Sequence, residues 1–171
     1  MQLVRPDEKY YQSYVEAAEE YRIHKVRTFS FLDTESTDIF ETIRNYEAGV
    51  HLPTGWVPAT YFWMVDENEF LGEICIRHEL TESLLKLGGH IGYGVRYSKW
   101  NQGIGTEMLK RALPYGRDVL HLDQVLLTCN DDNYGSACVI ERNGGVLWDK
   151  IEHVVEKEKR VTRRYWITLD F

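Results

Sequence analysis

The stretch from Gly89 to Thr106 constrains the fold more than any other part of the chain. Its first residues, G-H-I-G-Y-G-V, are typical of a short apolar strand, and a polar loop then leads into a helix opened by Gly103, Ile104 and Gly105. The first turn of a helix carries unpaired backbone N–H groups and the positive end of the macrodipole. Glycines at that place let the backbone approach a ligand closely. The stretch therefore favours a phosphate or pyrophosphate ligand.

The glycines alone leave a second interpretation open, in which they only cap the start of a helix. Two common phosphate-binding motifs do not fit. The dinucleotide fingerprint G-x-G-x-x-G needs a glycine where this chain has Met108, and it would follow the first strand of the fold. A P-loop needs G-x-x-x-x-G-K-[ST], a string that the sequence does not contain.

Hydrophobic periodicity and turn residues predict the remaining elements. No linker, internal repeat or low-complexity tract divides the chain, so a single domain over residues 1–171 is expected. Strands are predicted at 2–5, 60–65, 70–78, 89–97, 125–129, 146–155 and 161–169. Helices are predicted at 7–21, 36–49, 103–117 and 133–142, with a short helical turn at 81–87. The order β-α-α-β-β-β-α-β-α-β-β indicates an α/β (α+β) class with a mixed central sheet of about seven strands flanked by about four helices.

Several boundaries follow from particular residues. Ser36 and Thr37 are candidates for the N-cap of the second helix, and Gly49 for its end. Pro114 is expected to bend or shorten the end of the helix at 103–117. The charged residues 156–160 are expected to form the turn between the last two strands.

Charge and hydropathy limit the class of partner. Twenty Lys and Arg residues against 27 Asp and Glu residues give a net charge of −7. Nucleic-acid binding needs a basic surface, so an acidic chain argues against it. The charge is compatible with a cationic substrate such as an amine, and equally with plain solubility. No apolar run reaches the roughly 18–20 residues of a membrane span, and the first residues lack the apolar core of a secretory signal. Cytoplasmic location and no membrane association are the expectations.

The cysteines do not indicate a metal site or a disulfide framework. Cys75, Cys129 and Cys138 are widely spaced and odd in number, and no His/Cys cluster has the spacing of zinc ligands. We expect them to be small buried thiols, and we expect no metal.

A second segment, residues 128–145, helps to interpret the stretch from Gly89 to Thr106. Residues 128–145 combine the end of a buried strand with a helix that begins at Asn133, has Ser136 three residues later and ends in E-R-N-G-G. Together with Ile91-Gly92-Tyr93-Gly94-Val95 and Gly103-Ile104-Gly105, this segment resembles the GNAT superfamily of N-acetyltransferases. The resemblance implies a GNAT-like acyl-CoA N-acyltransferase fold, acetyl-CoA as cosubstrate and an amine as acetyl acceptor. The first segment would bind the pyrophosphate of acetyl-CoA, and the second would contact its pantetheine arm.

The resemblance also assigns residues. The strand near Val95 would hold the thioester, and a backbone N–H there would stabilise the developing oxyanion. The residues expected to bind acetyl-CoA are Val95, Arg96, Asn101, Gln102, Gly103, Ile104, Gly105, Thr106, Asn133 and Ser136. His90, whose ordinary pKa suits a base at neutral pH, is the first candidate for the general base. Glu73 is a second candidate. By the alternation of side chains in a strand, Glu73, Cys75 and Arg77 share one face.

Two departures from the family pattern bear on function. Trp100 stands where the family has Arg or Gln at the start of the phosphate loop, although backbone N–H groups can bind phosphate without that side chain. Ile140 stands where many members have a tyrosine that protonates the departing CoA thiolate, and isoleucine has no proton to donate.

The sequence favours an acetyl-CoA-dependent N-acetyltransferase acting on a small-molecule or amino-acid-like amine by direct attack in a ternary complex. Three alternatives stay open. The acceptor could be a peptide or protein amine. The chain could be a catalytically weak acyl-CoA-binding or regulatory module, as Trp100 and Ile140 would allow. It could also be an interaction domain that binds no CoA. The long C-terminal hairpin makes a homodimer possible.

Overall fold

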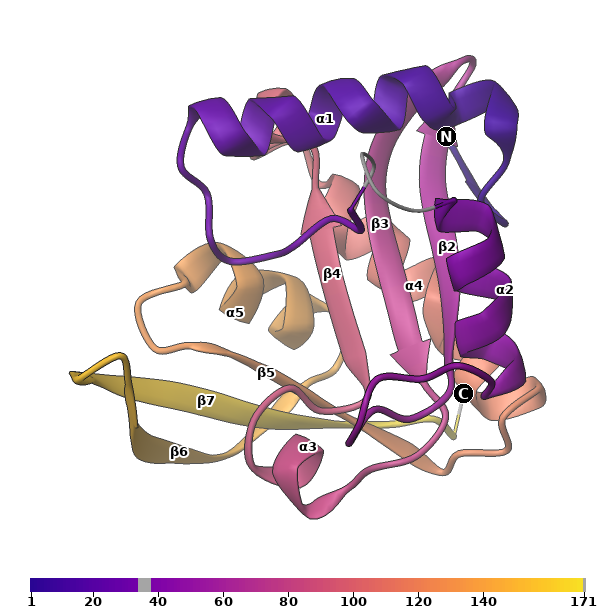
Figure 1. The fold of residues 1–171 in the computed structure, drawn as a ribbon. Helices are drawn as coiled ribbons and strands as arrows, with labels where there is room; N and C mark the ends of the chain where they lie inside the picture. Colours follow the sequence, from indigo (N-terminus) through magenta and orange to yellow (C-terminus); the bar gives the residue numbers. More distant parts are fainter. Residues whose placement is uncertain (34–37, 171) are drawn as a thin grey trace.

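A seven-stranded mixed sheet forms the centre of the molecule in the computed structural model, which describes residues 1–33 and 38–170 (Figure 1). Its strands are β1 (Gln2–Val4), β2 (Ala59–Asp66), β3 (Glu69–Arg77), β4 (Ile91–Val95), β5 (Gln124–Asn130), β6 (Val146–Val155) and β7 (Glu158–Thr168). Their order in the sheet is β1-β2-β3-β4-β5-β7-β6. β4 and β5 pair in parallel, and the other neighbouring strands pair antiparallel. The predicted fold class is confirmed.

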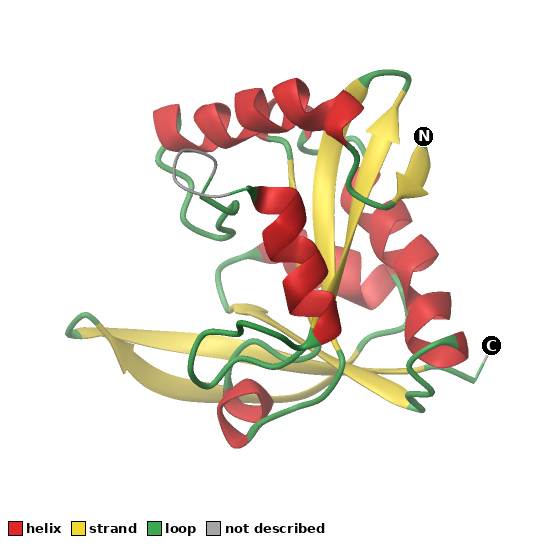
Figure 2. Cartoon of the chain, turned by 45° about the vertical axis from the view of Figure 1, so that its right-hand side comes forward, coloured by secondary structure: helices red, strands yellow, loops and turns green. Residues whose placement is uncertain are grey.

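Helices cover both faces of this sheet. α1 (Tyr11–Ile23) and α2 (Ile39–Ala48) lie on one face. On the other face, α4 (Ile104–Asp118) runs behind β2 and β3 in Figure 1, and α5 (Tyr134–Arg142), drawn beside β4, packs against α4. The short helix α3 (Glu82–Lys86) precedes β4, and 3₁₀ turns occupy Glu8–Tyr10 and Tyr97–Lys99. In Figure 2 the hairpin of β6 and β7 extends to one side, away from α1 and α2.

The packing of α4 explains why the glycine loop is held firmly. As the periodicity predicts, Ile104, Met108, Leu109 and Ala112 are all buried, with exposed fractions of 0–4%. They pack on β3, β4 and β5 as part of one large apolar cluster. Burying a side chain of this size stabilises the fold by roughly 1.5–3 kcal/mol each. The amino-terminal end of α4 is thereby fixed beside β4.

The strands β4 and β5 diverge, and this opens the sheet next to that helix end. Ile91 and Leu127 form the one Cα pair of their parallel ladder. Figure 1 shows the two strands running apart from there. This opening is a loss of backbone pairing between β4 and β5, which side chains of β4 and α5 bridge.

Four local expectations need correction. α4 continues past Pro114 to Asp118, so the proline does not shorten it. The last hairpin turns at residues 156 and 157, both with positive φ, so β7 begins three residues before Val161. The strand expected at 89–97 is shorter, and its last residues form a 3₁₀ turn. Cys138 is exposed, although Cys75 and Cys129 are buried as expected.

The start of α2 differs in another way. Ser36 and Thr37, the proposed N-cap residues, lie outside the described residues. Asp38 caps the helix, because its carboxylate accepts hydrogen bonds from the backbone N–H groups of Phe40 and Glu41. Gly49 ends the helix in the left-handed conformation, as predicted.

Candidate active site

The loop between β4 and α4 presents a row of unpaired backbone N–H groups. Asn101 and Gly103 both have positive φ, of 62° and 76°, a backbone conformation found in loops that bind anions through N–H groups. Within the described chain, the N–H groups of residues 101–106 have no hydrogen-bond acceptor, and the helical bonds of α4 start with Glu107. Residues 101–103 are also exposed. This arrangement fits an anion such as a pyrophosphate.

The two glycines of this loop have different structural roles. A Cβ at Gly103 would meet nothing within 4 Å, but the φ of 76° would strain any L side chain. A Cβ at Gly105 would lie 3.2 Å from Val139 and 3.5 Å from Val95. Gly105 is therefore needed for the close packing of α4 against α5 and β4, and Gly103 for the shape of the loop.

The cations near the loop are already neutralised by carboxylates. Arg96 is largely buried and pairs with Glu20 at 2.7 Å, with weaker pairs to Glu16 and Glu69. Lys99 pairs with Glu69 at 2.9 Å. These contacts hold the end of β4 to α1. Because these cations are already paired, we expect the loop to bind an anion mainly through its backbone N–H groups.

Trp100 takes up a structural position that explains its departure from the family pattern. Its indole Nε1 donates a hydrogen bond of 2.8 Å to the carbonyl oxygen of Val95, and the hydroxyl of Tyr21 donates a second one of 2.6 Å. The indole also packs beside Tyr97, with ring centroids 4.7 Å apart. Trp100 thus fixes the last carbonyl of β4.

His90 lies at the point where β4 and β5 begin to diverge. Its ring is 5% exposed, and Nδ1 accepts a hydrogen bond of 2.9 Å from the backbone N–H of Leu126. Burial, with a contribution from the nearby Arg77, lowers the pKa of His90 to about 4. The neutral ring then carries its proton on Nε2, and its lone pair at Nδ1 is occupied. This geometry favours a structural role, although the general-base assignment stays a prediction.

Glu73 lies on the face of the sheet that α1 and α2 cover, directly opposite Gly94 of β4. It is 1% exposed, and Trp63 Nε1 donates a hydrogen bond of 2.7 Å to its Oε2. Burial raises the pKa of Glu73 to about 7, while the bond from Trp63 opposes that rise. A carboxyl group with a pKa near the working pH is suited to general acid–base chemistry.

Aromatic rings surround Glu73 on this face. Tyr14 stacks on Trp63 with ring centroids 4.7 Å apart. Phe29 covers Gly94, since its Cδ1 lies 2.6 Å from the place a Cβ would take. Sequence reasoning missed Trp63 and Phe29; the alternation of β2 could have placed Trp63 on the face of Glu73, but nothing local signals Phe29.

Asn133 and Ser136 stand together at the start of α5. Asn133 caps the helix by accepting a hydrogen bond of 3.1 Å from the backbone N–H of Ser136. The hydroxyl groups of Ser136 and Tyr93 lie 2.7 Å apart, which links α5 to β4 across the opening. Ile140 is fully buried and belongs to the core. The structure therefore brings Val95, Gly105 and the start of α5 together around the opening between β4 and β5.

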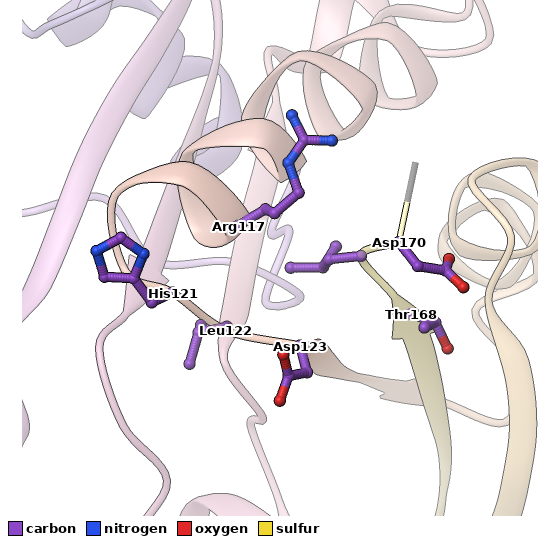
Figure 3. Close-up of a pocket in the computed structure, with 7 residues that line it drawn as sticks. Arg117, His121, Leu122, Asp123, Thr168 and Asp170 are labelled. Atoms are coloured by element: carbon purple, nitrogen blue, oxygen red, sulfur yellow. The ribbon is translucent and has the colours of Figure 1, made fainter.

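A separate hollow lies at the other end of α4 and shares no residue with these groups. Figure 3 shows its lining, which consists of Arg117, His121, Leu122, Asp123, Thr168, Leu169 and Asp170. A helix of 15 residues is about 22 Å long. The hollow is therefore remote from the glycine loop.

The chain belongs to the acetyltransferase (GNAT) domain family, whose pattern matches residues 3–146. A search of curated proteins finds no match. Among solved structures, the chain is similar to RimL, a ribosomal L7/L12 alpha-N-protein acetyltransferase in complex with coenzyme A, at 19% identity and a TM-score of 0.68. That alignment covers 98% of this chain and 93% of RimL.

Two further structures share the fold. A GNAT-family acetyltransferase from Bacillus anthracis is 16% identical with a TM-score of 0.69, and covers 99% of this chain and 95% of its own. A spermidine N-acetyltransferase SpeG mutant from Vibrio cholerae is 14% identical with a TM-score of 0.65, and likewise covers 99% and 95%. At these identities the likeness is one of fold.

The described residues lack two kinds of feature. No helix among them is long and apolar enough to cross a membrane. They also contain no group of three or more His, Cys, Asp or Glu residues that could hold a metal ion.

Proposed function

We propose that this protein transfers the acetyl group of acetyl-CoA to the amine of a small-molecule or amino-acid-like acceptor, by direct attack in a ternary complex. The observation that carries the proposal is the position of Glu73, a buried carboxyl group with a pKa near 7 opposite Gly94, one residue before Val95. Family membership supplies the reaction class. The position of Glu73 supplies a base for it on the face of the sheet that α1 and α2 cover.

The acetyl-CoA site is proposed from the loop and the opening beside it. The pyrophosphate would accept hydrogen bonds from the free N–H groups of residues 101–106 at the positive end of α4. The pantetheine arm would enter the opening between β4 and β5, near Asn133 and Ser136. RimL, which shares the fold, was solved with coenzyme A.

Glu73 would act on the amine. An alkyl ammonium group has a pKa near 10, so it must lose a proton before it can attack the thioester. The Glu73 carboxylate takes that proton, the amine nitrogen forms a bond to the acetyl carbon, and a backbone N–H near Val95 stabilises the oxyanion. Because Glu73 is 1% exposed, the amine reaches the carboxylate only after side chains that cover it move.

The leaving group does not require a protein acid. When the C–S bond breaks, its electron pair stays on sulfur, and a thiol of pKa about 8.5 is a tolerable leaving group as the thiolate. The second proton that the attacking nitrogen loses as the amide forms goes to this thiolate or to water. The absence of a tyrosine at Ile140 is therefore compatible with turnover. Holding the amine and thioester together would supply much of the remaining rate.

Two other functions have specific support. A peptide or protein acceptor is favoured by the likeness to RimL, which is described as a protein acetyltransferase. An acyl-CoA-binding module with weak catalysis is favoured by Ile140, which cannot donate a proton. Free-thiol release from acetyl-CoA with small amines, and separately with short peptides, distinguishes the three.

Binding of acetyl-CoA is tested first and without catalysis. At 100 to 1,000 times its Kd, acetyl-CoA should stabilise the fold by about 3–4 kcal/mol in thermal or urea unfolding. Gly103→Pro, which distorts the loop, should lose this stabilisation, while Gly144→Pro, in the turn after α5, should keep it. No stabilisation of the wild-type protein would reject both the enzyme and the CoA-binding proposals.

Location and assembly are further proposals. We propose a cytoplasmic enzyme that forms a homodimer through β6, which is an edge strand with exposed Val146, Leu147, Trp148 and Val154. Light scattering would test the dimer, and Val154→Lys should shift it toward monomer.

A further inference from the structure

Arg77 is a half-buried cation that pairs with no Asp or Glu among residues 1–33 and 38–170. The other buried or half-buried arginines of the described chain all pair with a carboxylate within 4.0 Å; they are Arg96, Arg117, Arg160, Arg163 and Arg164. Arg77 instead donates from Nη1 to the backbone carbonyl oxygens of Gly88 and Gly89, at 3.2 and 3.0 Å. A guanidinium held by two backbone carbonyls favours an additional anionic partner, which the described part of the chain does not provide.

Glu73 shows the complementary feature on the same face of the sheet. It is 1% exposed, it accepts a hydrogen bond from the neutral indole of Trp63, and no cation of the described chain pairs with it. Burying a lone carboxylate is costly unless a partner arrives. A positively charged amine would be such a partner before it gives up its proton.

The side chains of Glu73 and Arg77 lie on the same face of β3, four residues apart. Cys75 separates them in β3, with Glu73 opposite Gly94 and Cys75 opposite Gly92. The guanidinium of Arg77 lies over Gly92, with Nη2 and Nη1 at 3.7 and 3.9 Å from the place a Cβ would take. Burial raises the pKa of the Cys75 thiol; Arg77 opposes that rise and Glu73 adds to it, so both groups are within electrostatic reach of Cys75.

We propose that Arg77 binds a carboxylate of the acceptor while Glu73 takes its amino group. The preferred acceptors are then amines that carry a carboxylate, as ω-amino acids do. This inference rests on the proposed function. Residues two apart in a strand are about 7 Å apart, which is the spacing from Gly94 to Gly92. Because Glu73 lies beside the first glycine and Arg77 over the second, amino acids of four to six carbons fit best.

The test compares matched acceptors that differ in the carboxylate alone. For the wild-type protein, kcat/KM for 5-aminopentanoate should exceed that for pentylamine by about tenfold to hundredfold, since a charged hydrogen-bonded pair contributes on that scale. Arg77→Met should lose this preference through a higher KM for 5-aminopentanoate with kcat little changed. Arg77→Lys should retain part of it, and Arg160→Met, on the distal hairpin, should retain all of it.

A charge reversal separates recognition from a general loss of structure. Arg77→Glu should invert the preference, so that 1,5-diaminopentane is acetylated better than 5-aminopentanoate. Equal use of 5-aminopentanoate and pentylamine by the wild-type protein, or no inversion in Arg77→Glu, would overturn the inference and leave the acetyltransferase proposal standing. Acetyl-CoA binding without transfer to any of these amines also counts against the inference, whereas absence of acetyl-CoA binding overturns the proposed function itself.

Discussion

Trp63 and Glu73 form a buried hydrogen bond across neighbouring strands, with the indole Nε1 of Trp63 2.7 Å from Oε2 of Glu73. The two residues face each other in the β2–β3 register. The bond favours the ionised carboxylate and burial favours the neutral acid. The balance of these two effects holds the pKa of Glu73 at about 7, close to a neutral working pH.

Replacing Glu73 should affect the reaction and not the binding of acetyl-CoA. Glu73→Gln keeps the volume and removes the base, so kcat should fall by about 10²–10⁴-fold. Thermal stabilisation by acetyl-CoA should be unchanged. Glu67→Gln, in the exposed turn just before β3, is the matched control and should retain full activity. A Glu73→Gln protein with wild-type kcat would exclude this residue as the base.

The pH dependence of activity should report the same carboxyl group. Because Glu73 must be ionised to act, kcat should rise with pH and level off above a pKa of about 7. Trp63→Phe removes a hydrogen bond to the carboxylate, so the pKa of Glu73 should increase and the rise of kcat should move to higher pH. If kcat of Trp63→Phe rises at the same pH as that of the wild-type protein, the titrating group is not Glu73.

Stability should show a matching dependence on pH. The pKa of Glu73 is about 7 in the folded state against 4.5 for the free side chain, so the folded state binds the proton more tightly. The stabilising contribution is complete below pH 4.5 and is lost as pH rises through 7, at a cost of about 3 kcal/mol. Urea unfolding at pH 5 and pH 8 should show that Glu73→Gln lacks this loss. The same loss in the variant would place its origin elsewhere.

His90 should contribute to stability and little to turnover. Its Nδ1 accepts the backbone N–H of Leu126, so His90→Ala leaves that group unpaired and should cost about 1–3 kcal/mol. Activity per folded molecule should change less than tenfold, and His90→Asn should recover part of the stability. A loss of kcat above a hundredfold in a folded His90→Ala protein would instead make His90 the base.

Acid conditions give an independent check on His90. Its pKa is lowered to about 4 from 6.5, so the unfolded state binds the proton more tightly. This contribution to stability is present above pH 6.5 and lost as pH falls toward 4. His90→Asn should remove that part of the acid destabilisation, as measured by urea unfolding between pH 4 and 7.

The two glycines of the phosphate loop should respond differently to substitution. Gly105→Val must displace Val139 and Val95 and should destabilise the fold by about 1–3 kcal/mol. Gly103→Ala faces open space but has a φ of 76°, so its cost should be about 1–2 kcal/mol. Gly103→Asn should cost less than Gly103→Ala, because asparagine tolerates this conformation. Equal effects of Ala and Asn would argue against backbone strain at this position.

Sequence patterns predicted the parts of the structure that depend on local chemistry. Alternation placed Glu73, Cys75 and Arg77 on one face, and helical spacing placed Met108 and Leu109 in the core. These features follow from side-chain periodicity within a single element. The caps at Asn133 and Gly49 also follow from local residues.

Features that depend on contacts between distant segments could not be read from the sequence. The pKa of Glu73 depends on Trp63 and on burial, and the pairing of Arg96 depends on Glu20 of α1. The structural position of His90 depends on where β5 lies, because its partner is the Leu126 backbone. Sequence alone ranked His90 above Glu73 by ordinary pKa values, and burial reverses the order of those values.

The most direct test of the proposed reaction is acetyl transfer itself, measured by mass spectrometry of the products with 5-aminopentanoate and acetyl-CoA. We predict one N-acetylated acceptor for each free CoA, at a rate that falls at least a hundredfold in Glu73→Gln and stays unchanged in Glu67→Gln. The account would be contradicted if protein that binds acetyl-CoA gave no acetylated product with this acceptor, with amines that lack a carboxylate, or with peptides.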